Sequence, residues 1–220
     1  MAVRVLLADD HTLVRQGLRA VLEREGIEVV GEASDGREAI QLCERLHPDV
    51  AVLDVSMPLL NGIDAAHEIG RSHPRTKTVL LTMHTEDIFV LQGLRSGVSG
   101  FVLKQRSAEE LVRAIREVSR GEIFLSAGIC RTVVHAYVNK TELPTDPLSD
   151  RERQVLQLVA EGKTNQETAS ILDISPNIAE FHSANIMEKL DIHDTAGLVR
   201  YAIQFGLIDA KPCSRPQETK

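Results

Sequence analysis

Short apolar runs alternate with segments of helical period along the first 120 residues. The apolar runs occupy residues 3–8, 27–31, 50–53, 78–81 and 100–103. The segments between and after them repeat their apolar positions every three or four residues, over 11–24, 36–46, 62–72, 86–96 and 107–120. Five strand and helix pairs in this order predict a doubly wound α/β domain built on a parallel sheet.

The pattern changes near residue 120. We expect the helix at 107–120 to begin with a capping box, Ser107 with Glu110, and to stop at Gly121. Residues 126–138 have the pattern of a further helix, and the following stretch carries prolines and no apolar period. We therefore place the α/β domain at 1–122 and a linker containing one helix at 123–147.

Beyond residue 147 the strand signal vanishes and four short helices are predicted. Their start signals are two capping boxes, a serine before a proline, and an aspartate, found at Ser149/Glu152, Thr164/Glu167, Ser175-Pro176 and Asp194. The helices should cover 151–161, 165–172, 176–190 and 194–206, which makes residues 148–208 a small all-α domain. The polar, proline-containing tail at 209–220 is expected to be disordered.

Three polar groups stand directly after predicted strands. Asp9 and Asp10 follow the first strand, Asp54 follows the third, and Lys104 follows the fifth. Because the carboxyl ends of parallel strands lie at one edge of a sheet, we expect these side chains to converge. Three carboxylates and one ammonium in one crevice predict a cation site beside a possible phosphoryl acceptor.

Composition adds limits to this picture. The 220 residues have ordinary apolar and charged content, and no apolar stretch approaches the roughly 20 residues needed to span a bilayer. Without a signal-peptide layout, a cytoplasmic location is expected. Cys43, Cys130 and Cys213 lack metal-ligand spacing, so reduced thiols are expected, with Cys43 on an apolar helix face in the core.

The strand-end residues carry a resemblance to a known family. Asp9-Asp10, residues 54–62, Thr82 and Lys104 resemble the receiver domain of two-component response regulators. The C-terminal part resembles the LuxR-type helix-turn-helix domain of the NarL/FixJ family, through residues 148–156, Gly162, Asn165, Glu167, Ala169, Leu172, Ile174, Ser175, His182, Ile186, Lys189 and Leu190. The resemblance implies a five-stranded flavodoxin/CheY-like sheet in the order 2-1-3-4-5 and a regulator rather than an enzyme.

The resemblance also implies roles for the strand-end residues. Asp54 would accept a phosphoryl group from a sensor histidine kinase, and self-phosphorylation and self-dephosphorylation there would be the only chemistry. A carboxylate that attacks phosphorus needs cations to offset its own charge, and Mg²⁺ prefers hard oxygen ligands. The implied Mg²⁺ ligands are Asp9, Asp10, Asp54 and the backbone carbonyl of Ser56. Lys104 and Thr82 would contact the phosphoryl oxygens, and Phe101 would repack with Thr82 as a switch.

Simpler roles exist for several of these residues. Asp9 and Asp10 could cap the helix that begins near His11. Thr82 could be an ordinary strand-end hydroxyl, and Phe101 could be plain core.

In the helical domain, the helices at 165–172 and 176–190 have the proportions of a helix-turn-helix whose second helix enters the major groove. The candidate contacts to double-stranded DNA are Asn177, Glu180, His182, Ser183, Asn185 and Lys189. The last helix resembles a dimerisation helix, and the residues of its apolar stripe are Leu198, Val199, Ala202 and Ile203. That stripe could instead serve packing within the domain.

The recognition helix departs from its family in charge. Glu180 stands where the family usually has a basic residue, and residues 141–220 carry a net charge of −5 out of −7 for the chain. Few cations imply weak and weakly salt-dependent DNA binding. The basic residues that remain available are Arg151, Arg153, Lys163, Lys189 and Arg200.

Two hypotheses of different class follow. The first is a phosphorylation-dependent transcription regulator that binds promoter DNA as a homodimer. The alternative is a phosphoacceptor whose helical domain binds DNA poorly and works through protein contacts or dimerisation. DNA binding at low salt would separate the two.

Overall fold

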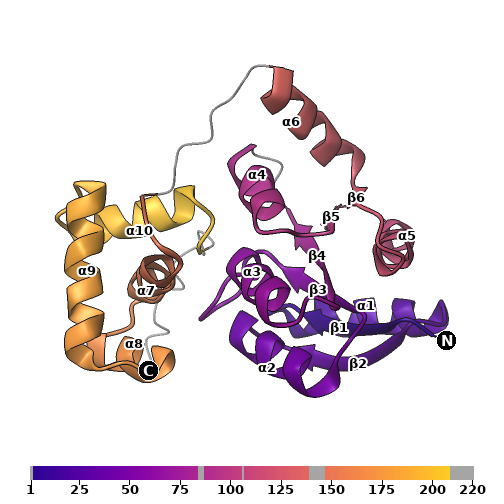
Figure 1. Cartoon of the computed structure of the whole chain (residues 1–220), viewed down its shortest axis with the longest axis horizontal. Coiled ribbons are helices and arrows are strands. Elements are labelled where there is room, and N and C mark those ends of the chain that lie inside the picture. Colours follow the sequence, from indigo (N-terminus) through magenta and orange to yellow (C-terminus); the bar gives the residue numbers. More distant parts are fainter. Residues whose placement is uncertain (1, 84–86, 106, 139–146, 209–220) are drawn as a thin grey trace, which may run out of the picture.

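The computed structural model describes residues 2–83, 87–105, 107–138 and 147–208. Figure 1 shows an α/β part and a helical part lying side by side. Residues 139–146 of the predicted linker and the whole predicted disordered tail lie outside the described residues, as do Cys213 and Glu86, the predicted start of the fourth helix.

The α/β part is built on a parallel sheet. Within the described residues its strands are β1 Arg4–Ala8, β2 Glu28–Ala33, β3 Val50–Asp54, β4 Lys77–Thr82, β5 Gly100–Leu103 and β6 Phe124–Leu125. They are ordered β2-β1-β3-β4-β5-β6, and every neighbouring pair is parallel. The predicted order of five strands is confirmed, but the predicted strand number is wrong. The sixth strand is only two residues long, which is too short to show a period in the sequence.

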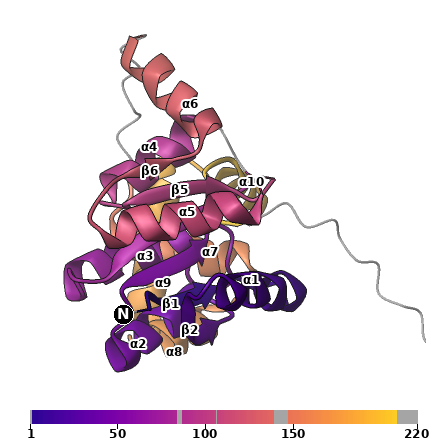
Figure 2. The same cartoon turned by 90° about the vertical axis from the view of Figure 1, so that its right-hand side faces the viewer.

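Helices cover both faces of the sheet. One face is covered by α1 Thr12–Arg24 and α5 Ala108–Ser119, which lie in front of the sheet in Figure 2. The other is covered by α2 Gly36–Leu46, α3 Gly62–Ser72 and α4 Asp87–Arg95, and the extra helix α6 Ala127–Val138 packs beside α4. Because side chains alternate along a strand, Val5 and Leu7 enter one core and Leu6 and Ala8 the other.

The start of α5 differs from its prediction. Ser107 is the N-cap residue, but its side chain makes no capping hydrogen bond. Glu110 instead accepts a hydrogen bond from the hydroxyl of Ser126, which itself accepts one from the Leu103 N–H. The predicted capping box is therefore wrong, because a residue brought in by β6 and α6 takes the Glu110 carboxylate.

The helical part consists, in the described residues, of α7 Asp150–Ala160, α8 Asn165–Leu172, α9 Pro176–Leu190 and α10 Thr195–Gln204. The capping boxes at Ser149/Glu152 and Thr164/Glu167 are confirmed. Ser175 and Asp194 also cap their helices as predicted. A separate apolar core, which includes Leu156, Leu158, Leu172 and Ile186, holds these four helices together.

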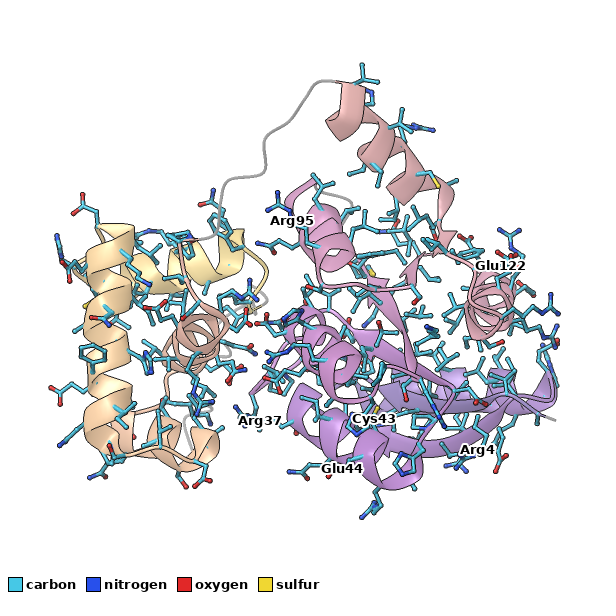
Figure 3. The ribbon with its side chains drawn as sticks, in the orientation of Figure 1. Arg4, Arg37, Cys43, Glu44, Arg95 and Glu122 are labelled. Carbon is cyan, nitrogen blue, oxygen red and sulfur yellow. The ribbon has the colours of Figure 1, made fainter. Side chains whose placement is uncertain are left out.

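The cysteine predictions hold for the described residues. Cys43, labelled in Figure 3, is fully buried in α2, and burial raises the pKa of its thiol to about 12. Cys130 is a free, exposed thiol. None of the helices among the described residues has both the length and the apolar character needed to cross a membrane.

Candidate functional site

The carboxyl ends of four strands bring the predicted residues to one edge of the sheet. Asp9 follows β1, Asp54 ends β3, Thr82 ends β4 and Lys104 follows β5. The backbone keeps these ends in register, because the Lys104 N–H donates to the Thr82 carbonyl at 2.8 Å and the Val55 N–H to the Leu81 carbonyl at 2.9 Å.

Lys104 joins two of the carboxylates. Its ammonium nitrogen lies 2.7 Å from Asp54 Oδ2 and 2.9 Å from Asp9 Oδ2. Both carboxylates are buried, with residue exposures of 4% for Asp54 and 1% for Asp9. The other oxygen of Asp9 accepts a hydrogen bond from the His11 N–H at 2.8 Å, at the start of α1. Asp9 therefore helps to begin the helix and also contacts Lys104.

Burial controls the charge of the acceptor candidate. It raises the pKa of Asp54 to about 6, although Lys104 and the Ser56 N–H act in the opposite direction. Burial lowers the pKa of Lys104, but the charges and hydrogen bonds of Asp54 and Asp9 outweigh it, so the net pKa is raised. At neutral pH the edge therefore holds a mostly ionised Asp54 in a poorly solvated place, where a further cation would stabilise it.

Oxygen ligands for such a cation are close together. Ligand atoms of Asp9, Asp10, His11 and Asp54 all lie within 4.8 Å of one another. Ser56 and Asp10 also line one cavity beside this cluster. His11 was given no role from the sequence, yet its Nδ1 lies 2.7 Å from Asp10 Oδ1. Its place directly after Asp9-Asp10 was the signal for that contact.

The two switch candidates are both buried. Thr82 is 2% exposed and Phe101 is 1% exposed. The ring of Phe101 lies in the core against Gly93, where an added Cβ would lie 2.3 Å from the ring carbon Cζ. The position fits the plain core role, and the switch role stays a prediction.

The candidate DNA contacts on α9 differ in how available they are. Asn177 and Glu180 are exposed, while His182, Ser183 and Asn185 are half-buried. The Ser183 hydroxyl donates to the Ala179 carbonyl. The Lys189 ammonium lies 2.7 Å from Glu152 Oε2, in the capping box of α7.

Two of the other basic residues that the sequence analysis named as available for DNA contacts also have partners within the protein. Arg151 donates to the Leu172 carbonyl, and Arg153 pairs with Asp64 of α3. The sequence interpretation missed Ile178 and Phe181, which are 45% and 62% exposed on α9. Their spacing from the core residues Ala179 and Ile186 could have shown that they point outward.

The four dimerisation candidates on α10 divide into two pairs. Leu198 and Ala202 are buried in the core of the helical part, at 1% and 0% exposure. Val199 and Ile203 instead line a cavity of about 430 Å³ whose other wall includes Asp10 and Ser56. Packing within the domain therefore accounts for half of the stripe.

The fold and the cluster of Asp9, Asp54 and Lys104 at the carboxyl edge of the sheet together define a class of protein. It is the class of two-domain regulators with a receiver domain and a helix-turn-helix output domain. The family model of the response regulator receiver domain matches residues 5–116, and that of the luxR family of bacterial regulatory proteins matches residues 146–202. The chain belongs to the NarL/FixJ family of two-component response regulators, and it is a DNA-binding transcription regulator.

Similar proteins match over nearly their whole length. The response regulator UvrY of Escherichia coli (strain K12) is 36% identical over 215 residues, which cover 96% of this chain and 99% of UvrY. The transcriptional regulatory protein MctR of Rhizobium johnstonii is 37% identical over 207 residues, 94% of this chain and 95% of MctR. A similar solved structure is that of RcsB from Salmonella enterica serovar Typhimurium, bound to promoter rprA in the presence of phosphomimetic BeF3⁻. It has 28% sequence identity to this chain and a TM-score of 0.61, and the match covers 91% of this chain and 98% of that chain.

Proposed function

We propose that Asp54 accepts a phosphoryl group from a sensor histidine kinase and that this modification controls DNA binding by α9. The observation that supports it is the Lys104 ammonium held between Asp54 and Asp9, with Asp10 beside them. A carboxylate oxygen of Asp54 would attack phosphorus, the bond from phosphorus to the imidazole nitrogen would break, and the released imidazole would take up a proton. The product on Asp54 is an acyl phosphate.

The donor set fits Mg²⁺, with Asp9, Asp10, Asp54 and the Ser56 backbone carbonyl as its ligands. The side-chain donors are carboxylate oxygens, and the buried charge of Asp54 favours added positive charge. When bound, Mg²⁺ supplies charge neutralisation at the phosphoryl oxygens. Lys104 would pair with one of these oxygens, and the Thr82 hydroxyl would donate to another.

For DNA, α9 would enter the major groove and present Asn177, Glu180, His182, Ser183 and Asn185 to base edges. Lys189 would first have to leave Glu152. Dimerisation would use the α10 surface at Val199 and Ile203, because Leu198 and Ala202 already serve the domain core. Few phosphate contacts and a shallow salt dependence are expected.

The acceptor assignment is tested by labelling with radioactive acetyl phosphate in Mg²⁺. Wild type should be labelled and Asp54→Asn should not, because an amide cannot form an acyl phosphate. Asp49→Asn is the matched control, since Asp49 lies beside the opposite end of β3 and its oxygen can still accept the Arg4 N–H as an amide. Full labelling of Asp54→Asn would refute the assignment.

The same samples test control of the output. Labelled wild type should shift genomic promoter fragments at lower protein concentration than unlabelled wild type, and Asp54→Asn should not respond to acetyl phosphate. Absence of any DNA binding, labelled or not and at low salt, would favour the second function, in which the exposed Ile178 and Phe181 contact a protein.

A further inference from the structure

The outer side of α9 presents large apolar side chains to solvent. Among the described residues of the helical part, the exposed large apolar side chains are Ile178, Phe181 and Ile203, and the first two lie on α9. Phe181 is 62% exposed and Ile178 is 45% exposed, whereas Ala179 and Ile186 on the inner side of the same helix are buried. Exposure of a phenyl ring and a branched chain to water is unfavourable, so a partner that covers both side chains is stabilised by apolar contact.

Ile178 and Phe181 lie together in the first two turns of α9. The Ser175 hydroxyl accepts the Ile178 N–H at 3.3 Å, which caps the helix and fixes its first turn. Residues three apart on a helix are neighbours on its surface, so the two side chains lie side by side. Ala184, three residues after Phe181, is also exposed and adds a methyl group. These three residues, Ile178, Phe181 and Ala184, form the apolar patch of α9.

The apolar patch of α9 faces away from the rest of the described chain. Figure 1 shows α9 on the side of the helical part remote from the sheet. The helical part contacts the receiver part through α7 instead, where the Gln157 side-chain amide donates to the Met57 carbonyl at 2.9 Å. The patch is therefore open to a partner, on the helix that a helix-turn-helix places in the major groove.

The charges of α9 do not favour the phosphate backbone of DNA. Glu180 and Glu188 are exposed, and carboxylates repel phosphates. Within Pro176–Leu190 the one lysine or arginine is Lys189, whose ammonium lies 2.7 Å from Glu152 Oε2. Because α9 gains little from phosphate contacts, its own contribution to affinity has to come from the base edges.

Thymine has the major-groove edge that fits an apolar side chain. Its C5-methyl group projects into the groove, and alanine and phenylalanine are among the side chains that contact it there. Three residues of helix rise about 4.5 Å, which is close to the spacing of about 3.4 Å between neighbouring base pairs. Ile178 and Phe181 are therefore spaced to contact the methyl groups of neighbouring thymines.

We propose that the apolar patch of α9 reads thymine, with Ile178 and Phe181 contacting the C5-methyl groups of neighbouring thymines in the major groove. The inference rests on the proposed function, because it takes α9 as the helix that enters the groove. It adds the chemistry of the DNA site, which should contain thymines opposite the start of α9. Because the contact is apolar, the preference for thymine should not depend on salt.

The test compares thymine with uracil, which lacks the C5-methyl group and keeps the same hydrogen-bonding groups. A duplex is selected from a random-sequence library with the full chain, treated with acetyl phosphate in Mg²⁺ at low salt. The selected duplex is then synthesised with deoxyuridine in place of thymidine at one position at a time. Fluorescence anisotropy gives the dissociation constant of each duplex for wild type and for each variant.

The variants are Ile178→Ala, Phe181→Ala and Phe181→Leu. Each changes an exposed side chain, so the fold of the helical part is retained. Leu13→Ala is the matched control, because Leu13 is an 83% exposed apolar side chain on α1 of the receiver part.

Wild type should lose affinity by about fourfold for each contacted methyl group that is removed, as expected for the burial of one methyl group. Phe181→Ala should bind the thymine duplex more weakly and should not distinguish thymine from uracil at the position that Phe181 contacts. Phe181→Leu should keep part of the difference, and Ile178→Ala should lose it at a neighbouring position. Leu13→Ala should match wild type. Added salt should weaken binding to both duplexes by the same factor.

Three results would overturn the inference while DNA binding itself stands. The first is a selected site without thymine, or equal binding of wild type to the thymine and uracil duplexes. The second is a thymine preference that persists in both alanine variants, which would assign the methyl contact to other residues. The third is wild-type affinity of both alanine variants for the thymine duplex, which would leave the patch for a protein partner.

Failure of the proposed function has a different outcome. If acetyl phosphate leaves DNA affinity unchanged while wild type still distinguishes thymine from uracil, control by Asp54 fails and the reading of thymine stands. If the selection recovers no duplex at low salt, DNA binding by α9 fails and the reading of thymine fails with it.

Discussion

The buried charge of Asp54 predicts a pH-dependent gain in stability when the carboxylate is removed. The folded pKa of about 6 lies above the usual 3.8, so protonation favours the folded state. The sign follows from linkage: this stabilisation is fully present below pH 3.8 and is lost as the pH rises through 6. At 1.36 kcal/mol for each pH unit, the ionised carboxylate costs the receiver about 3 kcal/mol above pH 7 when no cation is bound.

Asp54→Asn removes this cost and keeps the side-chain shape. In a metal chelator at pH 7.5, the variant should be more stable than wild type by about 1–3 kcal/mol, the lower figure allowing for its lost contact with Lys104. Lys104 keeps Asp9 as a partner at 2.9 Å. At pH 4.5 the calculated cost of the wild-type carboxylate falls to about 1 kcal/mol, so the gain should shrink by about 2 kcal/mol.

Hydrogen exchange of the β1 and β3 amides measures this free energy for the receiver part alone, which avoids treating two domains as one unfolding unit. Asp49→Asn is again the control and should show no such change between pH 4.5 and 7.5. Adding Mg²⁺ at pH 7.5 should stabilise wild type more than Asp54→Asn. A gain that is the same at both pH values, or a loss of stability at pH 7.5, would refute the assignment of the cost to ionised Asp54.

Two further predictions concern backbone space at the site and charge on the recognition helix. Gly62→Ala should destabilise the receiver by roughly 1–3 kcal/mol in urea denaturation, because its Cβ would lie 2.0 Å from the Asp54 carbonyl oxygen. The control Gly17→Ala should not destabilise the receiver, because no atom lies within 4 Å of the added Cβ. An unchanged stability of the Gly62 variant would contradict the packing argument. Glu180→Lys should tighten DNA binding and steepen the plot of log affinity against log salt by about 0.9, whereas Glu180→Gln should leave the slope unchanged. The same slope for all three proteins would place residue 180 away from the DNA phosphates.

The periodicity of the sequence determined most of the receiver fold and the location of its site. Strands with apolar residues on both faces must lie between two layers of helices, so β1, β3 and β5 had to be central or covered. Because parallel strands end at a common edge, Asp9, Asp54 and Lys104 had to meet once those strands were paired. Local capping chemistry likewise set the starts of α7 and α8, since each box joins residues only three apart.

Other features depended on residues far apart in the chain. Glu110 accepts a hydrogen bond from the Ser126 hydroxyl instead of forming the predicted capping box with Ser107. The short strand β6 forms only because it can pair with the edge of β5. The sequence could not show that Leu198 and Ala202 are core while Val199 and Ile203 border the acceptor edge, since all four share one apolar stripe. Which of these four residues are buried in the domain core depends on the neighbours that pack against each side of α10.

The contact between the two parts is the largest such case. Gln157 and the Met57 carbonyl lie 100 residues apart in the sequence, and neither has a local pattern that predicts the other. A periodic pattern fixes which face of an element is buried, because burial is repeated along the element. A single polar side chain that recognises a distant loop is not repeated, so only the assembled tertiary structure could decide that the helical domain docks beside Asp54.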